Sequence, residues 1–176
     1  RASRERKASM LIPPFEHHLK YDLSGYPQTH RRNPISFFGR ILTISDVFDA
    51  ITSPRIYRPT ALSPDRALKF MYKGTGKDFD PVLLKAFIDM IGLLPLGTVL
   101  ELDTGELAVV VKNGKPVHPA RPRAVVLNKD EQTGEFYKGK TISLADKDLT
   151  SGKYLRNIVG TRHCSHLNIQ PVDFML

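Results

Sequence analysis

The chain is organised around the stretch Glu16-His17-His18-Leu19-Lys20-Tyr21-Asp22-Leu23-Ser24-Gly25-Tyr26-Pro27. It is followed by Ile44-Ser45-Asp46-Val47-Phe48-Asp49-Ala50 and then by Arg55-Ile56-Tyr57-Arg58-Pro59. Two adjacent imidazoles, a Gly-Tyr-Pro turn, a carboxylate in an apolar run and two nearby guanidinium groups thus occur within one short part of the chain. Side chains of these kinds suit the joint binding of metal ions and phosphate.

Helical periodicity surrounds this stretch. Apolar residues recur at helical spacing from residue 35 to residue 51, so Pro34 is expected to begin a helix that ends at Thr52-Ser53-Pro54. The break at Pro13-Pro14 is expected to start a short helix that carries His17 and His18.

Two further helices are expected on the C-terminal side of the arginines. Ser63-Pro64-Asp65 and Asp80-Pro81 each have the form of a helix start, with a capping side chain followed by proline. Gly74 and Gly92 are expected to mark the two helix ends.

The pattern changes to strands near Pro95. Residues 98–102 and 107–112 flank Asp103-Thr104-Gly105-Glu106, which predicts a hairpin. Other β-like runs are expected at residues 123–127, 136–137, 141–144 and 167–172, while 154–159 is ambiguous. We therefore expect an α+β protein with a helical portion at 1–94 and a small antiparallel β-rich module at 95–176.

Composition limits the classes of function. The net charge is +8, and residues 1–60 contribute 10 basic against 5 acidic side chains, which favours an anionic ligand. No recognisable nucleic-acid motif accompanies the charge, so nucleic acid is not expected as a partner. No transmembrane segment or signal peptide is expected, and the single Cys164 fits a reducing cytoplasm.

The candidate ligands of a metal are His17, His18 and Asp46. Neighbouring side chains of a helix diverge by about 100°, so the two imidazoles are expected to serve different groups; a structural role for both stays open. Aspartate is a weak helix former, and Asp46 lies between apolar residues, where it needs a partner such as a metal. The alternative is that Asp46 and Asp49 are surface acids paired with Arg40.

Arg55 and Arg58 are the candidate phosphate-binding residues. Guanidinium groups match phosphate oxygens in a bidentate manner. The alternative is that both cap a helix end or cover surface.

In order and spacing, these motifs resemble the second half of an HD-GYP domain. The resemblance runs from about residue 15 to Gly92 and continues more loosely into the tail through Leu94-Pro95-Leu96-Gly97-Thr98. It implies a bacterial, metal-dependent phosphodiesterase that hydrolyses cyclic di-GMP at a site of two or three ions, typically iron or manganese. Residue by residue, it implies that His17, His18 and Asp46 bind metal.

The resemblance also implies that Arg55 and Arg58 hold substrate phosphate, and that Gly25-Tyr26-Pro27 is the signature loop beside the site. That loop is expected to contact partners, among which a GGDEF-type protein is one candidate, and a homodimer is another expected assembly. A two-metal site can activate water and stabilise the attacking and leaving oxygens at phosphorus, which fits this hydrolysis.

The sequence departs from the family pattern in three places. No His-Asp dipeptide occurs in the chain, so it is expected to lack the N-terminal half of the domain, and the activity is assigned to the full-length protein. Leu19 replaces a usual acidic residue and Leu23 a usual glycine. A degenerate, non-catalytic module that binds a cyclic dinucleotide or a protein partner is therefore the alternative function.

Two other motifs are weak. His163-Cys164-x-His166 has metal-binding residue types but no second pair, so a solvated loop is the default interpretation. Gly74-x-Gly76 is not expected to bind phosphate, because it lacks the lysine and the strand of a P-loop.

Overall fold

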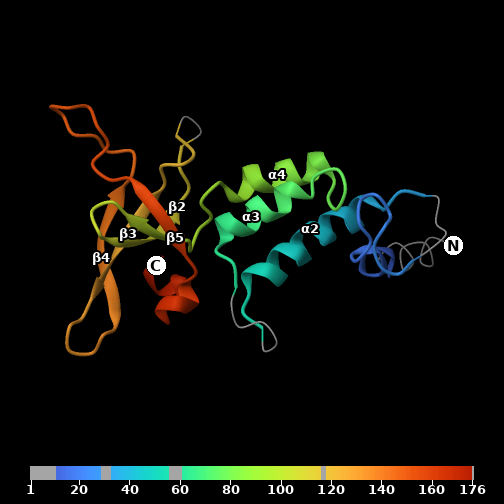
Figure 1. Ribbon diagram of the computed structural model, residues 1–176, viewed down its shortest axis with the longest axis horizontal. Coiled ribbons are helices and arrows are strands. Elements are labelled where there is room, and N and C mark those ends of the chain that lie inside the picture. Colours follow the sequence, from blue (N-terminus) through green and yellow to red (C-terminus); the bar gives the residue numbers. More distant parts are fainter. Residues whose placement is uncertain (1–10, 29–32, 56–60, 116–117, 176) are drawn as a thin grey trace, which may run out of the picture. The chain divides into compact units, whose positions relative to one another are not determined.

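The computed structural model describes residues 11–28, 33–55, 61–115 and 118–175. Their helices and strands occur in the order expected of an α+β protein, helices first (Figure 1). Residues 11–16 are helical. The remaining elements are α2 (Phe37–Thr52), α3 (Pro64–Lys73), α4 (Pro81–Ile91), β1 (Val99–Leu102), β2 (Leu107–Lys112), β3 (Arg123–Lys129), β4 (Phe136–Ser143), β5 (Ile158–Arg162), and the 3₁₀ helices η1 (Cys164–Leu167) and η2 (Pro171–Phe174).

The chain divides into two compact units. The first comprises Arg1–Ser53 with Ala67–Met90, and the second Pro54–Arg66 with Ile91–Leu176. The two domains expected at 1–94 and 95–176 remain a proposal.

Helix α2 begins later than expected. Ser36, not Pro34, is its N-cap, and the Ser36 hydroxyl accepts a hydrogen bond from the Gly39 N–H at 3.1 Å. A hydroxyl can accept this bond and proline has no side-chain group to do so, which is why the helix starts at Phe37. The expected end is confirmed, because the Ser53 N–H donates to the Asp49 carbonyl and closes the last turn.

The starts of α3 and α4 are confirmed at Pro64 and Pro81. The Asp80 carboxylate accepts from the backbone N–H groups of Val82 and Leu83 and so caps α4. Apolar side chains of α2, α3 and α4 form the core of the first unit. Its buried members are Ile44, Met71, Phe79 and Leu84.

Two buried carboxylates tie elements of the first unit together. Asp80 also accepts from Arg40 of α2 at 2.5 Å. Glu16, which has no exposed surface, accepts from both the N–H and the hydroxyl of Ser36 at the start of α2. A buried charge is tolerated only with such donors, so these contacts define how the segments pack.

The second unit contains a five-stranded antiparallel sheet with the order β4-β3-β2-β1-β5. The hairpin between β1 and β2 is confirmed, with Val99 opposite Val109 and Gly105 at a φ of 81° in the turn. Apolar side chains alternate between the two faces of the sheet, and each face has its own buried cluster.

Two strand predictions were wrong. The two runs expected at 136–137 and 141–144 form one strand, β4, which ends at Ser143 and whose pairing with β3 is irregular between Val125 and Leu127. Residues 167–172 do not close the sheet, since they end η1 and begin η2. The strand beside β1 is instead β5, which overlaps the end of the segment left ambiguous.

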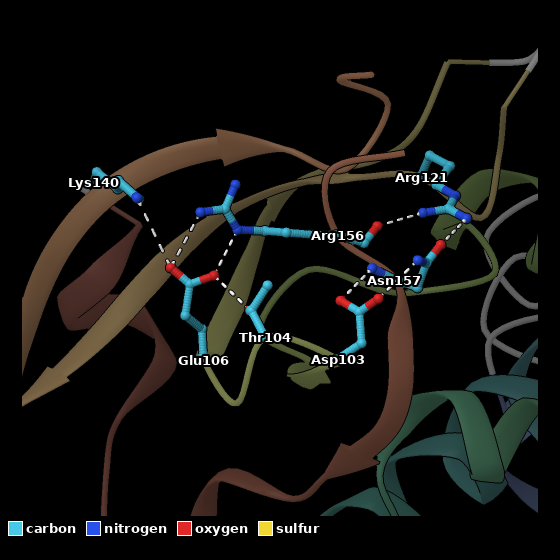
Figure 2. Close-up of polar contacts among 7 residues, drawn as sticks. All are labelled: Asp103, Thr104, Glu106, Arg121, Lys140, Arg156 and Asn157. Atoms are coloured by element: carbon cyan, nitrogen blue, oxygen red, sulfur yellow. Dashed lines mark hydrogen bonds and ion pairs between the residues drawn. The ribbon is translucent and has the colours of Figure 1, made fainter. Parts of the chain in front are cut away.

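A polar network fastens the loops at one end of the sheet (Figure 2). Glu106 accepts from Arg156 at 2.6 Å, and this ion pair is the largest cause that lowers the pKa of Glu106. Asp103 accepts from both the backbone and the side-chain N–H groups of Asn157, and Arg121 donates to the Arg156 carbonyl. The long connection between β4 and β5 is thus held to the β1–β2 hairpin.

Helix α2 has a second apolar face. Four large side chains near its N-terminal end are turned to solvent, and we call them the outer stripe: Phe37, Phe38, Ile41 and Leu42, with exposed fractions of 52%, 67%, 38% and 36%. Within the described residues, none of the helices combines the length and apolar character needed to cross a lipid bilayer.

We expect Asp80→Ala to lower the free energy of unfolding by about 2–4 kcal/mol, because it removes both an N-cap and one partner of a mostly buried ion pair. Urea denaturation measures the change. Lys85→Ala is the control, since it breaks the exposed Lys85–Asp89 pair of equal length and should cost at most about 0.5 kcal/mol. Equal losses in the two variants would contradict this assignment.

The contribution of the Asp80 carboxylate to stability should also depend on pH. Burial alone would raise the pKa of Asp80, but hydrogen bonds from Leu83, Arg40 and Val82 outweigh it and hold the pKa below the ordinary 3.8. A depressed pKa in the folded state contributes stability above pH 3.8 that is lost as the pH falls through the folded value. The stability difference between the parent and Asp80→Asn should therefore shrink on acidification.

Candidate metal centre

Three side chains from two separate segments converge in the first unit. The ligand atoms of His17, His18 and Asp46 all lie within 4.8 Å of one another. His17 and Asp46 are half-buried, whereas His18 is exposed. Two imidazoles and one carboxylate at this separation form a possible site for a divalent metal ion.

The short helix was expected to carry the two histidines, but His17 and His18 lie in the turn after it. The helical residues end at Glu16, and His17 and His18 form the turn that follows, closed by the Leu19 N–H donating to the Glu16 carbonyl at 2.8 Å. Their ring centroids are 3.9 Å apart and the planes are inclined by 39°. The imidazoles therefore face one group together, where helical neighbours would diverge.

A backbone carbonyl orients the first imidazole. Nδ1 of His17 donates to the carbonyl oxygen of Pro14 at 2.5 Å. A neutral imidazole that donates from Nδ1 keeps the lone pair on Nε2, which is the form a metal binds. Pro14 thus supplies a contact that sequence reasoning missed, because a carbonyl three residues away leaves no signal in the sequence.

Asp46 lies in the middle of α2, half-buried and in reach of both imidazoles. The alternative pairing of Asp46 and Asp49 with Arg40 is not observed, since Arg40 donates to Asp80. Asp49 accepts from the Ser53 hydroxyl at 3.0 Å and is not a member of the converging group.

The loop of Gly25, Tyr26 and Pro27 rests directly on the histidine turn. A Cβ added to Gly25 would lie 2.2 Å from the His18 carbonyl oxygen and 2.6 Å from the Lys20 nitrogen. The Tyr26 N–H donates to the same His18 carbonyl at 3.2 Å, and the Tyr26–Pro27 peptide bond is cis. A glycine is required here because backbone meets backbone without room for a side chain.

The residues between the histidines and this loop are tied to the connection between α3 and α4. The N–H groups of Tyr21 and Asp22 donate to the carbonyls of Asp78 and Lys77 at 3.1 and 3.0 Å. Lys20 pairs with Asp78 at 2.8 Å, and this partner raises the pKa of Lys20. Hydrogen bonds from Ser24 lower the pKa of Asp22. The histidine turn is therefore fixed from two sides.

Part of the chain, including the three candidate ligands, is similar to known proteins. The family profile of the HD domain matches residues 14–83, which contain all three candidate ligands. The chain is 35% identical over 109 residues to a cyclic di-GMP phosphodiesterase of Pseudomonas aeruginosa. It is 40% identical over 72 residues to the cyclic di-GMP phosphodiesterase response regulator RpfG of Xanthomonas campestris.

A third relative is the 3'3'-cGAMP-specific phosphodiesterase 3 of Vibrio cholerae, 38% identical over 79 residues. The three alignments cover 61%, 41% and 45% of this chain, but only 26%, 19% and 17% of the respective relatives. No solved structure gives a significant match.

Residues 14–83 match the HD domain family, and the Pseudomonas and Xanthomonas relatives are cyclic di-GMP phosphodiesterases by name. The resemblance drawn from the motifs is thereby confirmed. The two leucines that depart from the family pattern, Leu19 and Leu23, lie close to the histidine turn in the sequence. Leu19 is buried with 1% exposure, and Leu23 has a φ of 68°, a left-handed conformation that glycine adopts more readily.

Only one of the two candidate phosphate-binding arginines, Arg55, lies within the described residues. Arg58 lies outside the described residues. Arg55 is half-buried and belongs to the second compact unit. Their expected role toward substrate phosphate therefore stays a prediction.

The weaker motifs have structural roles. Nδ1 of His163 accepts from the Ser165 N–H and caps η1, and burial raises the pKa of the Cys164 thiol. Gly74 follows α3, and its carbonyl accepts from Lys77 and Asp78 in the turn before α4. The default interpretation of the His163 motif as a solvated loop was wrong, because His163 is buried and Cys164–Leu167 form η1.

Gly25→Ala should destabilise the first unit by about 1–3 kcal/mol, because the new methyl group overlaps backbone atoms of the histidine turn. Thermal melting measures the loss, and NMR of the imidazole protons reports on His17 and His18. The control is Gly76→Ala, where a Cβ meets nothing within 4 Å and only the positive φ is strained. Unchanged imidazole signals in Gly25→Ala would show that the loop does not hold the turn.

Proposed function

We propose that this chain is part of a metal-dependent phosphodiesterase that hydrolyses cyclic di-GMP, the activity belonging to the full-length protein. The observation that carries the proposal is the convergence of His17, His18 and Asp46 within an HD domain. The names of relatives in Pseudomonas and Xanthomonas support the substrate, since each is called a cyclic di-GMP phosphodiesterase.

The donor set fits a divalent metal. Two imidazole nitrogens and a carboxylate suit iron, manganese or zinc better than they suit calcium. We propose two or three ions, iron or manganese, which when bound would supply an activated water and neutralise charge on the phosphate. His17, His18 and Asp46 would hold them, with the Pro14 carbonyl keeping the His17 tautomer.

Arg55 and Arg58 are kept as candidate residues for binding substrate phosphate, as the resemblance implies. Guanidinium groups are suited to a phosphodiester because they donate two parallel hydrogen bonds to its oxygens and never lose their charge. Gly25, Tyr26 and Pro27 would form the wall of the site, since the loop rests on the His18 carbonyl.

Three ligands do not complete two coordination spheres of about four to six ligands each. The chain spans about a quarter of the length of the Pseudomonas relative and less of the others. We therefore propose that residues outside this chain, including the His-Asp pair for which the family is named, supply the other ligands. The GGDEF-type partner and the homodimer expected from the resemblance remain proposals, as does the cytoplasmic location expected from the single Cys164.

A non-catalytic binding module is the second candidate, favoured by two observations. Leu19 places a buried apolar side chain next to His18, where the family pattern has an acid, and Leu23 holds a strained backbone beside the signature loop. Such a module would bind a cyclic dinucleotide without cleaving it.

The deciding experiment uses the full-length protein loaded with Mn²⁺ or Fe²⁺ and supplied with cyclic di-GMP or 3'3'-cGAMP. The proposal expects linear product from cyclic di-GMP and strong loss of turnover in His18→Ala. Tight binding without product would favour the non-catalytic module. Faster turnover of 3'3'-cGAMP would move the substrate to that of the Vibrio relative.

Metal binding by this chain itself can be tested with a matched pair of acids. Asp46→Asn should weaken Mn²⁺ binding at least tenfold in calorimetry, because it replaces a charged ligand. Asp49→Asn, one turn further along α2 and outside the converging group, should bind Mn²⁺ within about twofold of the parent. Equal effects of the two substitutions would remove Asp46 from the proposed ligand set.

A further inference from the structure

The turn that carries the two histidines and the helix that carries Asp46 are distant in sequence, so their approach depends on contacts across space. Glu16 makes such a contact and directly precedes His17. Its carboxylate is fully buried and accepts from the Ser36 N–H at 3.0 Å and from the Ser36 hydroxyl at 2.5 Å.

The same hydroxyl begins α2. Ser36 Oγ accepts from the Gly39 N–H at 3.1 Å while it donates to Glu16, so the helix N-cap and the buried carboxylate share one group. Glu16 also lies near the positive end of the helix dipole. The donors and the dipole together offset the cost of burying a charge.

Gly39 makes this approach possible. A Cβ at Gly39 would lie 2.5 Å from Oε2 of Glu16 and 3.0 Å from its Cβ. The first turn of α2 and Glu16 are therefore in direct contact, and a side chain on that face of the helix would push them apart.

The anchor lies on the same rigid helix as Asp46. Ten residues separate Ser36 from Asp46, about 15 Å along the axis. A slide of α2 by one residue would shift Asp46 by about 1.5 Å and turn it by about 100°. Either movement would take the carboxylate away from the imidazoles.

We infer that Glu16 is a positioning residue of the metal centre, which sets the place of α2 and hence of Asp46 relative to His17 and His18. The inference deepens the proposed function and rests on it for the identity of the ligand. Glu16 is not a member of the converging group of ligand atoms, so it acts through the residues that are.

Mn²⁺ binding to this chain tests the inference, with calorimetry below the melting temperature of every variant. Glu16→Ala should weaken affinity about tenfold or more, because α2 would lose the contact that sets the position of Asp46. Glu16→Gln should stay within about threefold, because its amide oxygen still accepts both Ser36 donors. This rescue by the conservative variant would not follow from a change in bulk stability.

Leu84→Ala is the control for stability. Leu84 is a buried core residue of the same unit, and its truncation should lower the melting temperature while leaving Mn²⁺ affinity within about twofold of the parent. Parent-like affinity in Glu16→Ala, or an equal loss in Leu84→Ala, would overturn the inference.

A second arm does not depend on the native metal. In a Cys164→Ser background, the pair His18→Cys and Asp46→Cys should capture a trivalent arsenical that needs two adjacent thiols. Adding Glu16→Ala should weaken the capture about tenfold, and Glu16→Gln should preserve it. Unchanged capture with Glu16→Ala would overturn the inference. The proposed function is tested separately by turnover of cyclic di-GMP in the full-length protein, so the two can fail independently.

Discussion

The hydrogen bonds from Ser36 to the buried carboxylate of Glu16 are the constraint on which the first unit depends. They join the segment that ends in two imidazoles to the helix that carries the third ligand. Two neighbouring groups suit this contact: Gly39 leaves room for the carboxylate, and the Ser36 hydroxyl bonds to both the helix and the carboxylate. A charge buried in this way fixes direction as well as distance, because its donors have fixed geometry.

The elements that local signals define were predicted well. Ser63-Pro64 and Asp80-Pro81 are self-contained helix starts, and α3 and α4 begin there. The start of α2 was missed because the proline signal at residue 34 competes with Ser36, and a partner distant in sequence stabilises the serine. Strand β4 was divided in two because Gly139 interrupts its pattern, and an edge strand need not bury side chains continuously.

The candidate site was predictable only as a set of residues. The motif order named His17, His18 and Asp46, and the structure brings them together. How they meet was not predictable, because the turn after Glu16 and the Pro14 carbonyl depend on backbone geometry rather than on periodicity. The reason why residue 25 must be glycine was not predictable either, because it depends on the close approach of the His18 backbone.

The outer stripe of α2 has a consequence for the colloidal behaviour of the purified polypeptide. Each large apolar side chain left in water forgoes about 1.5–3 kcal/mol of burial free energy. Two phenylalanines with more than half of their surface exposed, followed by isoleucine and leucine one turn on, form a continuous adhesive strip. Burial of these side chains against another apolar surface would be favourable, so the outer stripe is the part of α2 at which self-association of the purified polypeptide is expected.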